Sequence, residues 1–169
     1  MENKKDKRFF IIFGLVVIFA SLVFAAVYFV NTSDREFVPR DKDSFKSQQD
    51  YLDYLEEYKQ AQSKDTYGGD TPEETLQLFI DALKAGDTTL ASKYFVLDKQ
   101  KEMEKDLEIG KRNGVLELLI GDLEKENKRI CYDYREACEF TTFDENNVAE
   151  FSFVLSLDSR SKIWKIESL

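Results

Sequence analysis

The pattern of apolar and polar positions begins with one long apolar run, and shorter helical and strand-like periods follow it. The run is Phe9–Val30, 22 residues without a charge, a proline or an amide side chain. As a helix it would be about 33 Å long, enough to cross the hydrocarbon core of a bilayer. A helix closes its backbone hydrogen bonds internally, which lipid requires. The pattern therefore predicts a transmembrane helix over residues 9–30.

The flank before this run sets the expected orientation. Residues 1–8 carry four cations, which favours a cytoplasmic N-terminus and an extracytoplasmic remainder. A cleaved signal peptide is the alternative, since Val23-Phe24-Ala25 resembles a cleavage pattern. The apolar run, however, exceeds the 7–15 residues usual for such a signal. There is also no cysteine near its end, so a lipoprotein anchor is excluded. We expect a single-pass cell-membrane protein with an uncleaved anchor.

Residues 31–70 are predicted to form a linker and a stalk helix. The helix is expected over Asp43–Lys64, with Asp43 or Ser44 as its N-cap. Gly68-Gly69 then marks a turn or hinge. A narrow apolar stripe on the helix could dock on the following domain, which we favour, or pair with a second copy. The stripe consists of Phe45, Leu52 and Leu55, with Tyr51 and Tyr58 at its margins.

The next helix has clear start and stop signals. Thr71 and Glu74 match a capping box, Pro72 suits the first helical position, and Gly86 suits the C-terminal end. Asp87 is then expected to cap a second, short helix over residues 88–95. The expected inward residues of the two helices are Leu76, Phe79, Ile80, Leu83, Leu90, Ala91, Tyr94 and Phe95.

Two further helices are predicted over Asp98–Arg112 and Val115–Lys125, separated by Asn113-Gly114. A strand over Val115–Ile120 is the alternative, but its leucine and glutamate content favours a helix. The residues expected to face inward are Met103, Leu107, Ile109, Leu116, Leu119, Ile120 and Leu123.

From Arg129 onward the apolar residues alternate, which is typical of strands. Strands are predicted over Arg129–Tyr134, Glu136–Phe143, Val148–Asp158 and Lys162–Leu169. Short turns join them, so we expect an antiparallel meander with one apolar face covered by the upstream helices. The fold class is α+β. In the clearest strand, Val148–Asp158, one face carries Phe151, Phe153, Leu155 and Leu157.

The chain has two cysteines, Cys131 and Cys138. A turn centred between Tyr134 and Arg135 would place them directly opposite each other on paired strands. An even pair in an exported domain suggests a structural disulfide, with two reduced thiols as the alternative. The pair alone cannot complete a zinc site.

Charge and composition narrow the classes of function. Residues 31–169 carry 20 Lys and Arg against 31 Asp and Glu, a net charge of −11. Such acidity argues against binding to nucleic acid or anionic lipid. The chain has no histidine, which excludes Ser-His-Asp and Cys-His catalysis and imidazole zinc sites. We expect neither a cofactor nor a metal.

One set of residues in the helix pair over residues 71–95 and near the end of the chain forms a recognisable pattern. They are Pro72, Glu73, Phe79, Ala82, Leu83, Gly86, Asp87, Ala91, Tyr94 and Phe95, followed by Trp164-Lys165-Ile166. With these residues the helix pair resembles the opening of bacterial, membrane-anchored extracytoplasmic domains of the nuclear transport factor 2-like (cystatin-like cone) superfamily. The resemblance covers residues 71–169 and implies helices packed on a curved antiparallel sheet. It implies no particular ligand, because that superfamily includes enzymes, binders and scaffolds.

Candidate catalytic groups are few. Isomerase-type members of the superfamily use an Asp with Tyr in the cavity, yet alternation places Asp133 on the face opposite Tyr132 and Tyr134. Glu150 lies on a polar strand face, and Asp144-Glu145 lacks the spacing of a calcium loop. Aromatic residues could line a pocket, although filling the core is favoured. These are Phe140, Phe143, Phe151, Phe153 and Trp164.

The sequence therefore predicts a membrane-anchored extracytoplasmic binding or interaction module without catalytic activity. One alternative is a scaffold subunit of a membrane-spanning complex such as a type IV secretion-like channel, which has a similar order of tail, span, stalk and domain. A second alternative is a cavity enzyme of the isomerase or dehydratase type. We expect a protein partner or a homo-oligomer and no binding to nucleic acid. The sequence does not identify a small-molecule ligand.

Overall fold

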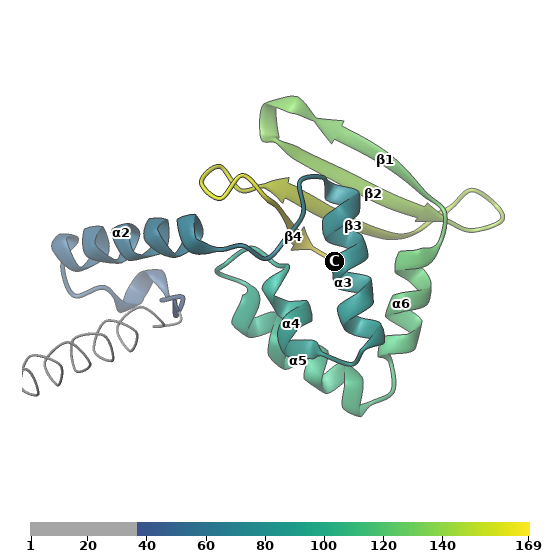
Figure 1. Cartoon of the computed structure of the whole chain (residues 1–169), viewed down its shortest axis with the longest axis horizontal. Helices are drawn as coiled ribbons and strands as arrows, with labels where there is room; N and C mark the ends of the chain where they lie inside the picture. The colour runs from purple at the N-terminus through teal and green to yellow at the C-terminus, as the bar shows by residue number, and fades with distance from the viewer. Residues whose placement is uncertain (1–36) are drawn as a thin grey trace, which may run out of the picture. The chain divides into compact units, whose positions relative to one another are not determined.

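An antiparallel sheet and a layer of helices make up residues 37–169, the part of the chain that this computed structural model describes (Figure 1). The strands are β1 (Asn127–Tyr132), β2 (Ala137–Phe143), β3 (Ala149–Leu157) and β4 (Trp164–Ser168). They pair in the order β1-β2-β3-β4, each antiparallel to the next. The predicted α+β class and the meander are confirmed.

Helices precede the sheet in the chain. They are α2 (Gln48–Lys64), α3 (Pro72–Lys84), α4 (Thr88–Lys93), α5 (Gln100–Arg112) and α6 (Leu116–Glu124), with short 3-10 turns at Lys42–Ser44 and Asp133–Arg135. The helical interpretation of residues 115–125 is thus confirmed. The predicted transmembrane segment, Phe9–Val30, lies outside the described residues. Within residues 37–169, no helix combines the length and apolarity needed to cross a membrane.

Local chemistry fixes both ends of α3. Thr71 Oγ1 accepts a hydrogen bond from the Glu74 amide at 3.1 Å, as the predicted cap requires. The Glu74 carboxylate accepts from the Asp70 amide at 2.8 Å, so the return bond falls one residue earlier than in a capping box. At the other end Gly86 has φ +68°, and the Asp87 amide donates to the Ala82 carbonyl. This is the left-handed ending that favours glycine.

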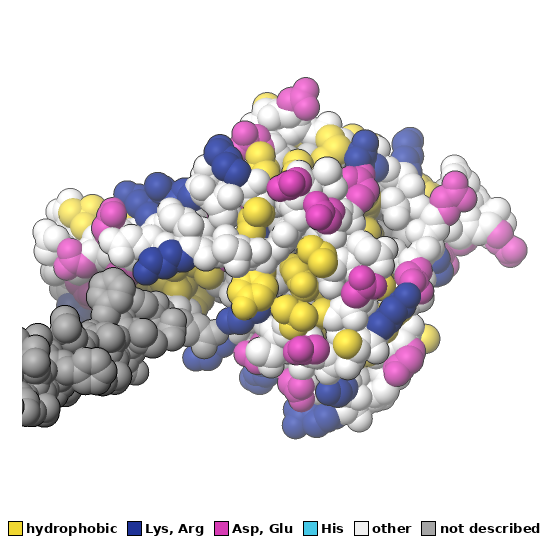
Figure 2. Space-filling model, in the orientation of Figure 1, with side chains coloured by type: hydrophobic (Ala, Val, Ile, Leu, Met, Phe, Trp, Pro, Cys, Tyr) yellow, Lys and Arg dark blue, Asp and Glu magenta, His cyan; other side chains and the backbone are white. Residues whose placement is uncertain are grey.

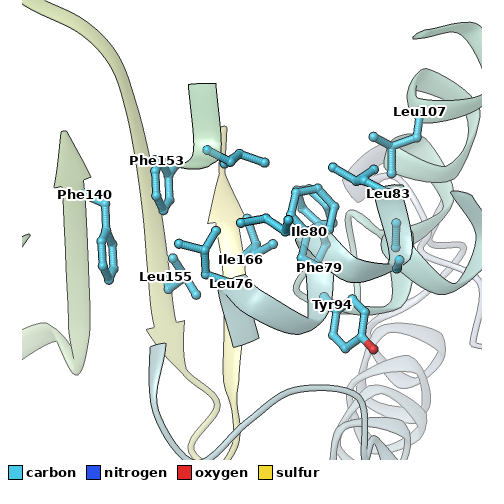
Figure 3. Close-up of a cluster of buried hydrophobic side chains, with 14 of the residues drawn as sticks. Leu76, Phe79, Ile80, Leu83, Tyr94, Leu107, Phe140, Phe153, Leu155 and Ile166 are labelled. Atoms are coloured by element: carbon cyan, nitrogen blue, oxygen red, sulfur yellow. The ribbon is translucent and has the colours of Figure 1, made fainter. Parts of the chain in front are cut away.

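The core lies between α3 and the sheet (Figure 3). Phe79 is fully buried and meets Phe95 edge-on, with ring centroids 5.4 Å apart. On the sheet, Phe140 and Phe153 stack at 5.0 Å. Burying a side chain of this size contributes about 1.5–3 kcal/mol. The core residues of the described part belong to residues 76–166, so residues 37–169 form one compact unit with a core of its own, which is what a domain needs to fold by itself.

The outer edge of β4 is covered by two segments from the helical region. The Ile166 amide donates to the Tyr94 carbonyl, and the Val96 amide donates to the Ile166 carbonyl. The Trp164 amide donates to the Gly69 carbonyl at 3.0 Å. Gly69 is buried, and a Cβ added at Gly68 would lie 2.4 Å from the Trp164 carbonyl oxygen. The predicted hinge at Gly68-Gly69 is therefore a fixed part of the fold.

Helix α2 differs from the stalk predicted from the sequence. Ser47, and not Asp43 or Ser44, is its N-cap, accepting from the Asp50 amide. No residue of α2 is buried, and Leu52 is 48% exposed, so the predicted docking of the whole stripe on the domain is wrong. The Phe37 ring instead lies 5.2 Å from Tyr58. At the C-terminal end of α2, Gln62 Nε2 donates to Asp158 Oδ2 at 2.8 Å.

Candidate functional site

An open groove of about 510 Å³ lies where α5, α6, β3 and the end of β4 meet. Its apolar lining includes Met103, Leu107, Leu116, Leu119 and Phe151, and the more exposed Val115 and Leu169 also line it. Leu107 and Leu116 are buried, whereas Met103, Leu119 and Phe151 are only half-buried. The sequence predicts that Met103, Leu107, Leu116 and Leu119 face inward. It does not indicate that some of them border an opening. Hydrophobic side chains also reach the surface among charged ones on the face shown in Figure 2.

The close approach of α5 and α6 shapes this groove. Gly110 lines it, and a Cβ there would lie 3.4 Å from side-chain atoms of Leu116 and Val115. The Val115 amide donates to the Gly110 carbonyl at 3.0 Å, and Gly114 has φ +69° in the turn between the helices. Glycine at both positions thus permits the tight corner. Ile109, predicted to face inward, is instead 38% exposed.

Charged groups border the apolar lining. Glu102 and Asp106 on α5 are exposed at the groove, as is Glu167 at the end of β4. Lys99 is the cation among the lining residues, and its Nζ donates to the main-chain carbonyl of Glu167. The border therefore has three carboxylates and one ammonium group. An apolar floor with a few polar groups at the rim is the usual chemistry of a ligand-binding site.

A second, more polar hollow of about 470 Å³ is lined by residues of all four strands and shares Lys99, Glu167 and Ser168 with the groove. Tyr132 and Glu139 line it, and the Tyr132 hydroxyl donates to Glu139 Oε2 at a long 3.4 Å. Ser152 donates to the other carboxylate oxygen of Glu139 at 3.1 Å. Little apolar surface is available there to bury on binding. We therefore take the groove beside α5 and α6 as the candidate site.

A buried lysine is the most unusual polar group among the described residues. Lys165 is 2% exposed, and its ammonium donates to Asp65 Oδ2 and to the carbonyls of Tyr67 and Lys93, each at 2.7 Å. Burial lowers the pKa of Lys165, and the charge of Asp65 opposes that shift. Gln100 Nε2 also donates to Asp65. All three donors of the ammonium are used, so its geometry suits an anchor for residues 65–67.

The candidate catalytic residues lie away from the groove. Asp133 and Tyr134 are exposed in the turn after β1, where Tyr134 is 77% exposed. Glu150 is exposed and forms an ion pair with Lys125 at 3.0 Å. Asp144 caps the β2–β3 turn by accepting from the amides of Val148 and Asn146, and these hydrogen bonds lower the pKa of Asp144. Across residues 37–169, no cluster of three or more His, Cys, Asp or Glu suits a metal ion.

The aromatic residues divide between core and surface. Phe140 and Phe153 are buried, and Trp164 packs partly buried against the core. Phe143 is 36% exposed at the end of β2. Phe151, on β3, is the aromatic residue of this set that lines the groove. Filling the core is thus the role of most of them, with Phe151 shared between core and site.

The two cysteines meet as the predicted register requires. Cys131 lies opposite Cys138 in the β1–β2 ladder, with the sulfur atoms 2.08 Å apart, at disulfide distance. The bridge closes the hairpin whose turn carries Tyr134. It lies on the sheet and takes no part in the groove.

No family model, no curated protein and no solved structure matches this chain.

Proposed function

We propose that this protein is a membrane-anchored extracytoplasmic binding module, without catalytic activity, that takes an apolar group into the groove between α5 and α6. The observation that carries the proposal is the half-buried lining of Met103, Leu119 and Phe151 at an opening of about 510 Å³. When a ligand covers apolar side chains that are partly in water, the free energy falls by about 25 cal/mol per Å² of apolar surface buried. The carboxylates lie at the rim, where they can orient a ligand.

The proposed arrangement in the membrane follows the sequence. Residues 1–8 form a cytoplasmic tail, residues 9–30 span the bilayer, and residues 31–70 connect the span to a domain over residues 71–169. Helix α2, which has no buried residue, is consistent with a spacer between membrane and domain. We further propose that the domain belongs to the nuclear transport factor 2-like superfamily. Its support is the set of matching residues, together with helices that cover one face of an antiparallel sheet.

A scaffold subunit of a membrane-spanning complex, such as a type IV secretion-like channel, is the second candidate. It is favoured by the exposed residues Tyr51 and Leu52 on α2, which are 43% and 48% exposed. Such residues could contact another copy or another subunit. A full-length protein that is strictly monomeric after purification, with no co-purifying partner, would count against this candidate.

A neutral solvatochromic dye, Nile red, tests the groove directly in residues 37–169. The matched variants are Leu119→Gln, which changes the lining, and Val148→Gln, which changes an apolar residue that is 59% exposed and outside the lining. We expect Leu119→Gln to weaken dye binding at least fivefold and Val148→Gln to leave it within twofold. Equal effects of the two variants, with both proteins folded by circular dichroism, would refute the proposal.

A further inference from the structure

We infer that the natural occupant of this groove is a peptide segment of a partner protein that combines an apolar anchor with flanking cationic side chains. This inference rests on the proposed function, since it names the ligand chemistry of the same groove. It follows from three features of the described residues: the lining, the charge of the border, and the apolar surface that continues beyond the opening.

The lining requires an apolar anchor. Leu107 and Leu116 form the buried part, and Met103, Leu119 and Phe151 stand around it. Methionine adapts its shape to different apolar partners, and an aromatic ring offers a large contact area. A Leu, Ile or Phe side chain of a partner would remove these residues from water without burying any charge of this chain.

The border selects the sign of charge on the partner. Glu102, Asp106 and Glu167 surround the opening, whereas Lys99 already donates to the Glu167 carbonyl. A ligand with a carboxylate or phosphate next to its apolar part would meet like charge, which is unfavourable at short range. A lysine or arginine beside the apolar anchor would instead meet the carboxylates of α5.

The charge of the whole exported part acts in the same direction. Its net charge of −11 creates a negative field that attracts cationic ligands and repels anionic ones. Long-range attraction of this kind raises association rates and is screened by salt. Fatty acids and anionic lipids are therefore disfavoured as occupants.

The surface next to the groove favours an elongated ligand, such as a helical peptide, over a compact one. Val115 lines the opening and is 45% exposed, and Leu118, 69% exposed, lies one turn further along α6. Gly121 follows with no heavy atom within 4 Å of its Cβ position, so a partner backbone can come close there. An apolar strip that leads out of an open groove is suited to a peptide, which can place one side chain inside and another along α6.

Three fluorescent synthetic peptides test this inference on residues 37–169. They share apolar residues at positions i, i+3, i+4 and i+7 and carry Lys, Gln or Glu at all other positions. We expect the Lys peptide to bind at least tenfold more tightly than the Gln peptide at low salt, and the Glu peptide to bind more weakly than either. The advantage of the Lys peptide should shrink several-fold at high salt.

Matched variants separate local charge from overall charge. Glu102→Gln with Asp106→Asn removes two border carboxylates, and Glu117→Gln with Glu145→Gln removes two exposed carboxylates outside the groove. We expect the first pair to weaken binding of the Lys peptide three- to tenfold with little effect on the Gln peptide, and the second pair to change binding less than twofold. Equal weakening by both pairs would overturn the assignment of the border.

Failure of this inference can be told apart from failure of the proposed function. If Leu119→Gln weakens all three peptides but the three bind equally, the groove binds apolar groups and the cationic preference is wrong. Dimerisation of residues 37–169 that Leu119→Gln abolishes would make a second copy the occupant and would also overturn the inference. If neither Nile red nor any peptide responds to Leu119→Gln, the proposed function itself fails.

Discussion

At Gly68 the backbone requires a residue without a side chain. Its φ is +150°, and a Cβ would lie 2.4 Å from the Trp164 carbonyl oxygen, which belongs to the backbone of β4 and cannot move aside easily. We expect Gly68→Ala to lower the free energy of unfolding by about 1–3 kcal/mol. Urea unfolding followed by circular dichroism measures this change.

Gly121 supplies the matched control for Gly68→Ala. It lies inside α6 with no heavy atom within 4 Å of its Cβ position. Alanine there gains helix propensity without a clash, so we expect Gly121→Ala to raise the free energy of unfolding by about 0.5–1 kcal/mol. If Gly68→Ala and Gly121→Ala both lower the free energy of unfolding, the contact with Trp164 is not the reason for the effect at Gly68.

The pKa of Asp50 reports the contact between α2 and the segment before it. Hydrogen bonds from Arg40, at 2.9 and 3.0 Å, and then from the Lys46 amide lower this pKa to about 2 from the ordinary 3.8. Because the folded-state pKa is the lower one, the stabilisation is complete above about pH 4 and is lost as the pH falls through 2. An NMR titration of the Asp50 carboxyl carbon measures the pKa.

Removing the partner of Asp50 gives a directional prediction. Arg40→Gln should return the pKa of Asp50 most of the way toward 3.8, since the Arg40 hydrogen bond is the largest cause of the shift. Arg160→Gln, a substitution on the β3–β4 turn, should leave it unchanged. A pKa that is the same in Arg40→Gln and in the unmodified chain would contradict this assignment.

Structural features that depend on only a few neighbouring residues could be predicted from the sequence. Thr71 and Gly86 act on backbone groups within five residues of themselves, and both do what their positions predict. The same logic fails at Asp43 and Ser44, because Ser47 is also a good N-cap and its hydroxyl accepts from Asp50. Competing caps of equal chemistry are decided by packing, here by the Phe45 and Phe37 rings against the tyrosines of α2.

At the scale of elements, Lys165 joins β4 to the connector after α2 and to the end of α4. We expect Lys165→Met to lower the free energy of unfolding by about 3–5 kcal/mol, because it leaves the carboxylate of Asp65 buried without its cation. Lys165→Met combined with Asp65→Leu should cost less than the sum of the two single changes, since no lone charge remains. A double-mutant cycle by urea unfolding measures this coupling.

Lys101→Met is the control for Lys165→Met, because Lys101 is exposed on α5. Its effect should stay within about 0.5 kcal/mol. Strict additivity in the cycle would mean that the pair contributes no coupling, and the anchoring role of Lys165 would then be wrong.

The β1–β2 hairpin carries a prediction about oxidation. The bridge between Cys131 and Cys138 spans a sequence separation of 7 and should contribute about 2 kcal/mol by restricting the unfolded chain. Cys131→Ser with Cys138→Ser should therefore lower the free energy of unfolding by that amount, and reductant should remove the difference from the unmodified chain. Two free thiols in the exported protein without reductant, seen by intact mass after thiol labelling, would contradict the bridge.

Contacts between distant parts of the chain explain what the sequence could not reveal. Asp65 and Lys165 are separated by 100 residues, and neither local pattern signals a buried charge. The groove needs α5, α6, β3 and the end of β4 together, so its lining could be predicted only as a set of apolar residues. The meander and the cysteine register were predictable because short turns fix which strands pair.

At the scale of the whole molecule, the proposed membrane anchor over residues 9–30 would determine where the groove can act. An uncleaved anchor would hold the domain close to the outer face of the membrane, where a tethered site meets other tethered proteins at high effective concentration. A modest affinity for a cationic peptide would then suffice. A released domain would need tighter binding to the same partner.

Accessibility to a membrane-impermeant maleimide tests the orientation in intact spheroplasts. In a background with Cys131→Ser and Cys138→Ser, a single added cysteine is placed by Asn3→Cys or by Glu145→Cys, the latter in the exposed β2–β3 turn. We expect Glu145→Cys to react in intact spheroplasts and Asn3→Cys to react only after the membrane is broken, because the cations of residues 1–8 favour a cytoplasmic N-terminus. Protein of full-length mass should stay in the membrane fraction after an alkaline carbonate wash. Loss of the mass of residues 1–25 would identify the segment as a cleaved signal, and the domain would then act as a free protein and not as a tethered one.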